Sequence, residues 1–325
     1  MTAQRIVLII LAIGMGAVAL ILSAETLIRI GLMDDSLTSE VEMTRKVAHA
    51  EVAVLRIILA TLGVILIAVA LFREQISESG PYKWLMRPDI PVPASYEAAL
   101  RRLAGPEAAI LGVAIISMLV YIRVGADVFT VDQLLAINLE DGILEWVSAV
   151  FLLLASLMSF FAARAIGRGH PRYNMHIFLT VLFFLMFGEE ISWSQRVFGF
   201  GTPEALQAVN VQSEINLHNM FGYLFDHVFI LLFLVWAACV PLAYQIVPPL
   251  RQVILRLGVP VPSAGLAVAM TISGLMLDPI VYRFLEPLPT LRLAEARETL
   301  ATLAFLVLMM EVRRHYINAG KPEVA

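Results

Sequence analysis

Eight apolar runs, each about 20 residues long, constrain the fold of this chain more than any other feature. They lie near residues 5–28, 47–72, 107–126, 142–166, 174–193, 220–246, 263–285 and 296–314. A helix of roughly 20 apolar residues crosses the ~30 Å hydrocarbon layer of a bilayer. With 59% hydrophobic and only 15% charged residues, the chain carries more apolar surface than a soluble core can bury. The sequence therefore predicts an all-α polytopic membrane bundle of about eight transmembrane helices.

Charge and cysteine content exclude several classes of partner. The formal net charge is -4, which argues against a nucleic-acid partner. The chain has a single cysteine, Cys239, so neither an internal disulfide nor a thiolate metal cluster can form. We expect membrane lipids to surround the protein. The sequence does not indicate an oligomeric state.

The distribution of basic residues predicts the orientation of the helices. Cytoplasmic loops are enriched in Lys and Arg. Placing the N-terminus inside assigns fourteen Lys and Arg residues to the cytoplasmic side and eight to the opposite side. We therefore expect both termini in the cytoplasm of a bacterium, with the protein in the inner membrane.

Proline-rich and charged segments divide the chain into four parts. We expect a two-helix N-terminal unit over 1–73, a cytoplasmic loop with an interfacial amphipathic helix over 74–106, a six-helix core over 107–317 and a tail over 318–325. The amphipathic helix is predicted at 95–104 because a serine that can cap it precedes alternating polar and apolar residues. The core carries nearly all the polar motifs.

Two dense polar stretches lie between strongly apolar runs. They are Gly188-Glu-Glu-Ile-Ser-Trp-Ser-Gln-Arg196 and Asn210-Val-Gln-Ser-Glu-Ile-Asn-Leu-His-Asn219. An ionised side chain at membrane depth costs at least ~2.5–3.5 kcal/mol, so such residues suggest a functional site. In the predicted topology both stretches face the periplasm. A polar cavity that opens outward follows from this placement, and a purely structural network of ion pairs is the alternative.

An excess of carboxylates over cations at this depth indicates a divalent metal. Carboxylates in a low dielectric must pair, become protonated or bind a cation. Spacings of three or four residues place pairs of acidic or histidine side chains on one helical face. Carboxylate ligation favours manganese, magnesium or calcium over zinc, without distinguishing among these ions. The predicted ligands are Glu140, Asp141, Glu145, Glu190, Glu214, His218 and Glu298.

The two motifs also supply candidates for catalysis and for substrate binding. Arg196 has the geometry to clamp a phosphate or carboxylate, and Trp193 either stacks on a sugar or anchors the helix at the interface. The predicted catalytic residues are Glu189, Glu190, Ser192, Glu214 and His218. The predicted substrate-binding residues are Trp193, Gln195, Arg196, Asn210, Gln212, Asn216 and Asn219.

The two motifs resemble those of a family of bacterial multi-pass membrane proteins for which we can name no activity. The resemblance covers about 140–300. More distantly, the segment Glu140-Asp-Gly-Ile-Leu-Glu-Trp146 at a helix start is similar to alkaline ceramidase-like membrane hydrolases. That similarity implies an intramembrane zinc that activates water to cleave a lipid amide. The His-x-x-x-His pair of those hydrolases is absent from this sequence.

The residues thus predict a metal-dependent hydrolase or transferase that acts on a lipid or lipid-linked substrate from the periplasmic side. A metal-free acid and base pair, Glu214 and His218, is an alternative form of the same site. A proton- or cation-coupled transporter is the second hypothesis. Its relay would consist of Glu145, Asp226, His227, Asp278 and Glu298. A third is a non-catalytic membrane subunit whose polar outer face binds a periplasmic partner.

Overall fold

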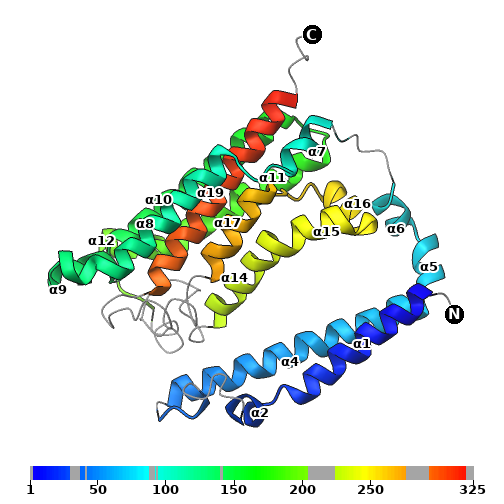
Figure 1. Cartoon of the computed structure of the whole chain (residues 1–325), viewed down its shortest axis with the longest axis horizontal. Helices are drawn as coiled ribbons and strands as arrows, with labels where there is room; N and C mark the ends of the chain where they lie inside the picture. Colours follow the sequence, from blue (N-terminus) through cyan, green and yellow to red (C-terminus); the bar gives the residue numbers. More distant parts are fainter. Residues whose placement is uncertain are drawn as a thin grey trace. The chain divides into compact units, whose positions relative to one another are not determined.

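The computed structural model describes residues 3–29, 37–40, 42–87, 92, 94–139, 142–203, 224–275 and 293–319. Every regular element in these ranges is helical, as the apolar runs predict (Figure 1). The chain forms two compact units. The first comprises mainly Met1–Leu85, and the second comprises mainly Met86–Pro203 and Val228–Ala325.

The first unit is a helical hairpin followed by two short helices. Its long helices α1 and α4 run antiparallel and pack through small side chains, so closely that a Cβ atom on Gly63 would lie 3.2 Å from the carbonyl oxygen of Ala12. An ion pair of 2.9 Å between Arg5 and Glu74 lies at one end of the hairpin. Its helices are α1 (Ala3–Ile21), α2 (Ala24–Arg29), α4 (Glu42–Leu71), α5 (Arg73–Glu78) and α6 (Gly80–Leu85).

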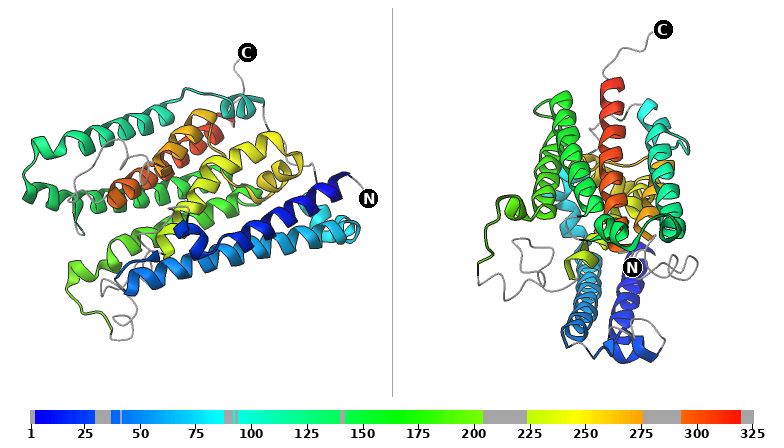
Figure 2. Two further views of the ribbon diagram at one scale, coloured as in Figure 1. Left: turned by 60° about the horizontal axis from the view of Figure 1, so that its bottom comes forward. Right: turned by 90° about the vertical axis from the view of Figure 1, so that its left-hand side faces the viewer.

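The second unit is a bundle in which α19 contacts α8, α10 and α17. Figure 2 shows α19 in red between α8 and the pair formed by α10 and α11. Its first helices are α7 (Ala94–Leu100), α8 (Pro106–Val128), α9 (Val131–Asn138), α10 (Ile143–Ile166), α11 (Pro171–Glu190), η1 (Ser192–Ser194) and α12 (Gln195–Phe198). The later ones are α14 (Leu224–Leu234), η2 (Val235–Cys239), α15 (Val240–Ile246), α16 (Pro248–Leu257), α17 (Ala264–Leu275) and α19 (Leu293–Ala319).

The core of the second unit is built around α19, which is apolar on all sides along its middle turns. Such a helix is buried on every side, and Leu300, Ala304 and Leu308 are at most 2% exposed. The ring of Phe305 contacts aromatic rings of α11, α14 and η2, including Phe183 at 5.1 Å between centroids. This aromatic contact fixes α19 against its neighbours halfway along the bundle.

Local chemistry explains where several helices begin and bend. Thr130 and Gln133 form a reciprocal capping box that starts α9, which satisfies two backbone donors at once. The π-helical turn η2 directly precedes α15, where Pro241 lies at the second position. Proline supplies no backbone donor and displaces the preceding turn. The cause of the irregular turn is therefore local.

In the described part of the chain, four helical segments are long and apolar enough to cross a membrane. They are Ala48–Leu71, Pro106–Gly125, Val131–Ile166 and Val228–Ile246. Two shorter apolar helices, Arg5–Ile21 and Ala264–Leu275, accompany them. The prediction of a helical protein with several apolar spans is thus confirmed. Eight spans with both termini inside the cell stay a prediction.

Candidate functional site

Helices α10 and α11 are antiparallel neighbours, and their hydrogen bonds set the register. The hydroxyl of Ser156 donates to the carbonyl oxygen of Thr180 at 2.8 Å, and Ser159 bonds His176 one turn further along. Moving one residue toward the C-terminus of α11 therefore corresponds to moving about one residue toward the N-terminus of α10. This register brings Glu190, at the end of α11, level with the first turn of α10, which contains Glu145.

Helices α10 and α19 run parallel and are also joined by hydroxyl groups. The Oγ atom of Ser148 lies 3.1 Å from Oγ1 of Thr299, and Thr299 also bonds the carbonyl oxygen of Leu144 at 3.3 Å. The first turns of both helices are thus side by side. They carry Glu145 on α10 and Glu295 on α19.

Three packed helices therefore bring predicted site residues to one end of the second unit. We call this the acidic end and define it by Glu145, Glu189, Glu190, Glu295 and Glu298. All five side chains are partly buried, and each has an interaction partner. The register brings the helix ends that carry Glu145, Glu190 and Glu298 to the same end of the unit, and the convergence of their side chains stays a prediction.

Among the described residues, α19 carries a buried cation close in sequence to two of these carboxylates. Arg297 belongs to the same turn of α19 as Glu295 and Glu298, and its side chain is only 6% exposed. A buried guanidinium of this kind is a counter-charge for carboxylates close to it. Glu145 and Glu295 also lie in the first turns of their helices, where the helix dipole favours negative charge. Glu189 and Glu190 lie at a helix C-terminus, where the dipole opposes it.

The chain has a sharp kink directly after α11, within the Gly188–Arg196 motif. Ser192 and Trp193 have φ angles of 45° and 51°. This is a left-handed backbone conformation that residues other than glycine rarely adopt. Ser192 is fully buried, whereas Trp193 is 40% exposed. Two consecutive residues of this kind store strain of order 1–3 kcal/mol each, and such strain concentrates at functional sites.

This kink places the indole ring of Trp193 over Gly188. A Cβ atom on Gly188 would lie 2.8 Å from a ring carbon of Trp193, so only glycine leaves room for the ring. The indole N–H of Trp193 donates to Oε1 of Glu189 at 2.7 Å. Sequence reasoning missed the role of Gly188, although a glycine five residues before a tryptophan, across a helix end, was the available signal.

The rest of this motif continues as a short helix. Gln195 donates through Nε2 to the hydroxyl of Thr202 at 2.6 Å, and Arg196 lies in α12. The predicted substrate-binding role of Gln195 is thus accompanied by a structural bond. The other predicted residues lie outside the described residues: Glu140, Asp141, Asn210, Gln212, Glu214, Asn216, His218 and Asn219.

The described residues do not by themselves complete a metal centre. No group of three or more His, Cys, Asp or Glu side chains lies close enough to hold an ion in the part of the chain that the structure describes. Oxygen ligands from Glu145, Glu190 and Glu298 match the preference of manganese, magnesium and calcium. Further ligands would have to come from outside the described ranges.

The opposite end of the second unit contains a second group of ionisable residues that the sequence did not single out. We call it the basic end and define it by Glu97, Glu107, Glu311, Arg251 and Arg314. Arg314 pairs with Glu107 at 2.7 Å, and Glu97 accepts hydrogen bonds from Arg251 and from the Tyr244 hydroxyl. Glu311, which is 2% exposed, accepts the backbone N–H of Ser263 at 2.9 Å. These partners are separated by up to 207 residues, and their pairing connects α7, α8, α16 and α19.

Comparison with family models, curated proteins and solved structures finds no match for this chain. The function must therefore be inferred from the residues at the two ends of the second unit. The basic end is a set of carboxylates with identified protein partners, which stabilises the packing of the helices. The acidic end gathers like charges beside a strained turn. Backbone strain of this kind concentrates at functional sites.

Proposed function

We propose that the chain is a multi-pass protein of the bacterial inner membrane with eight spans, and that its acidic end is the active site of an enzyme acting on a lipid or lipid-linked substrate. The observation that carries this proposal is the convergence of α10, α11 and α19, whose ends bear Glu145, Glu190 and Glu298. With fourteen basic residues inside and eight outside in the predicted topology, the acidic end faces the periplasm.

Helices are present at all eight predicted apolar runs, and this supports the eight-span topology. The four shorter or more polar members are α1, α11, α17 and α19. Each lies against a helix of its own unit that belongs to one of the four long apolar segments: α1 against α4, α11 and α19 against α10, and α17 against α8. A short apolar helix that packs against a full span is readily accommodated in a bilayer when the longer one tilts.

A divalent cation is part of the proposal. Glu145, Glu190 and Glu298 would supply oxygen ligands, and Glu140, Asp141, Glu214 and His218 would complete the site. When bound, such an ion supplies Lewis acidity and lowers the pKa of its water. The chain's own residues have separate tasks: Glu189 is oriented by the N–H of Trp193 and serves as a proton acceptor. Arg196 binds an anionic headgroup.

Metal content measured by mass spectrometry tests the proposal. We would compare the purified wild type with a Glu145→Gln, Glu190→Gln double variant after incubation with manganese, magnesium and calcium. We expect stoichiometric metal in the wild type and at least a tenfold loss in the double variant. Glu78→Gln, in the exposed end of α5, is the matched control and should retain the metal. Equal metal content in all three proteins would contradict the cation site.

Ion-coupled transport is a second candidate because of one observation. Buried polar side chains continue beyond the acidic end along α10 and α11, at Ser156, Ser159 and His176, which are at most 4% exposed. A transporter needs polar groups at this depth. Proton flux into liposomes that contain the protein would support transport if His176→Leu abolished it. Flux that is absent from the wild type would leave the enzyme as the better proposal.

A further inference from the structure

A groove runs between α1 and α4 in the first unit, separate from the acidic end. Its volume is about 570 Å³, within the ~300–1,000 Å³ of typical ligand sites. Its floor consists of small residues, including Ala12, Gly16 and Ala60, and its rim is aliphatic, including Ile57 and Val64. Ile57 and Val64 are 64% and 66% exposed. The groove is therefore open along its length and apolar, except for one residue.

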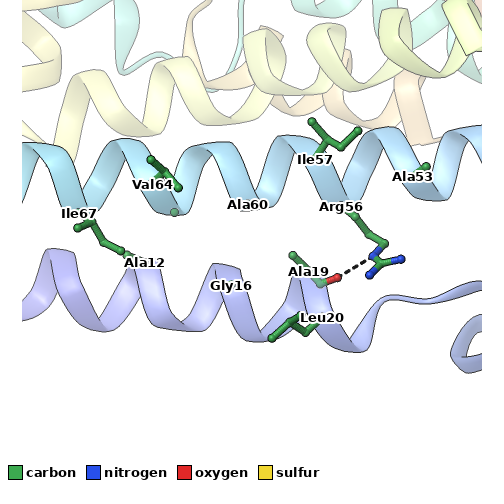
Figure 3. Close-up of a pocket in the computed structure, with 11 residues that line it drawn as sticks. Ala12, Gly16, Ala19, Leu20, Ala53, Arg56, Ile57, Ala60, Val64 and Ile67 are labelled. Atoms are coloured by element: carbon green, nitrogen blue, oxygen red, sulfur yellow. Dashed lines mark hydrogen bonds between the residues drawn. The ribbon is translucent and has the colours of Figure 1, made fainter.

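That exception is Arg56, whose side chain crosses from α4 toward α1 (Figure 3). Its Nε atom donates to the carbonyl oxygen of Ala19 at 2.9 Å. Ala19 lies two residues before α1 ends at Ile21, where backbone carbonyls lack partners within the helix. Arg56 thus caps α1. The guanidinium lies level with the last turn of α1 but inside the apolar segment Ala48–Leu71 of α4, so its long side chain reaches toward the lipid headgroups from below the membrane surface.

The capping bond uses Nε and leaves the two terminal nitrogens for another acceptor. No ion pair reaches Arg56 from any carboxylate in the described part of the chain. A guanidinium at or below the membrane surface without a counter-charge is costly, by at least ~2.5–3.5 kcal/mol at full depth. An anion that arrives with an apolar body would remove this cost and fill the groove.

We propose that this groove binds one anionic phospholipid, with the phosphate on Arg56 and an acyl chain along the floor formed by Gly16 and Ala60. Two features favour a phospholipid over other occupants. The groove is apolar over most of its length, as an acyl chain requires, and its single charge lies at one end, as in a lipid. Arg also binds phosphate through two parallel hydrogen bonds. The site lies within the first unit and does not depend on the proposed function.

Two pairs of variants of the full-length protein test the two parts of this site. Arg56→Gln removes the charge, and Arg29→Gln removes an exposed charge from the same unit as a control. Gly16→Leu fills the groove, and Gly14→Leu adds the same side chain outside it. A Cβ atom on either glycine meets nothing within 4 Å, so both leucine variants should fold equally well.

The experiment measures binding of phosphatidylglycerol and phosphatidylcholine to delipidated protein in detergent, by native mass spectrometry. We expect the wild type to prefer phosphatidylglycerol. Arg56→Gln should weaken its binding about fivefold, the effect of one basic residue near a membrane surface, and Gly16→Leu should weaken the binding of both lipids at least fivefold. Arg29→Gln and Gly14→Leu should bind both lipids as the wild type does.

Three outcomes would overturn the proposal. The first is unchanged phosphatidylglycerol binding in both Arg56→Gln and Gly16→Leu. The second is equal loss in a test variant and its control, which would indicate a nonspecific effect of charge or of added bulk. The third is unchanged lipid binding together with a shift from dimer to monomer in Gly16→Leu, which would assign the groove to a second copy of the chain.

Discussion

The two ends of the second unit both concentrate ionisable residues, yet they differ in how these residues are arranged. At the basic end, Glu107 and Glu311 are buried and each contacts an identified donor of the protein. At the acidic end, Glu145, Glu190 and Glu298 remain partly exposed, and the helix ends that carry them lie together. This difference in burial and pairing shows that a polar residue in an apolar bundle does not by itself indicate a functional site. Buried carboxylates that pair across helices indicate structure, whereas partly exposed carboxylates on neighbouring helix ends, beside strained backbone, indicate a site.

Removing a carboxylate from the basic end should have the largest effect on stability. Glu107 is 5% exposed and pairs with Arg314. Glu107→Ala should lower the free energy of unfolding by about 2–3 kcal/mol, because a charge-assisted hydrogen bond at a buried carboxylate is lost, while the 36% exposed side chain of Arg314 can be hydrated. Unfolding in sodium dodecyl sulfate, followed by circular dichroism, measures this change.

A surface pair of the same kind provides the control. Glu74 pairs with Arg5 at 2.9 Å, but its side chain is 79% exposed. Glu74→Ala should therefore lower stability by less than about 1 kcal/mol. Equal losses from the two substitutions would show that burial does not distinguish these pairs, and the structural role of the basic end would be wrong.

The second prediction concerns the strained turn at the acidic end. Gly188→Ala should destabilise the protein by about 2 kcal/mol. The new methyl group would clash with the ring of Trp193, and such overpacking is destabilising. Gly112→Ala, in α8, is the matched control: a Cβ atom there meets nothing within 4 Å, so this change should be neutral or slightly stabilising. A neutral Gly188→Ala would mean that the indole does not pack on α11 in solution.

The sequence predicted much of the fold and part of the candidate site. Hydrophobic run length placed a helix at each of the eight predicted positions, because helix formation over 20 apolar residues depends on local composition. It also located the Gly188–Arg196 motif at a helix end. Partners such as Glu107 and Arg314, which are 207 residues apart, could not be predicted, since their contact depends on how helices pack. The left-handed turn at Trp193 has no periodic pattern that would reveal it.

A third prediction uses pH to probe the loop between α10 and α11. The Nδ1 atom of His170 accepts the backbone N–H of Arg172 at 3.2 Å and caps α11. Burial, together with the charge of Arg172, lowers the pKa of His170 below its usual 6.5. The folded protein thus favours the neutral ring. Its stabilisation is complete above about pH 6.5 and is lost as the pH falls through the lower folded pKa.

Two variants separate the cap from its titration. His170→Ala should lose about 1 kcal/mol at pH 7.5 through the missing cap. His170→Asn retains an acceptor that does not titrate, so its free energy of unfolding should change less than that of the wild type between pH 7.5 and 5. The idea fails if the wild type and His170→Asn have parallel pH profiles.

The smallest expected effect tests the contact on which the acidic end depends. If α10 and α19 are joined as Ser148 and Thr299 indicate, the double-mutant cycle of Ser148→Ala and Thr299→Val should give a coupling free energy of about 0.6 kcal/mol, the average for hydrogen bonds between membrane helices. Ser148→Ala combined with Thr180→Val, whose hydroxyl bonds within α11, should give none. Coupling in the first cycle alone would support the register that brings the glutamates of α10 and α19 together. Its absence would separate these helices at the acidic end and remove the basis for a shared site, while leaving the pairs of the basic end unaffected.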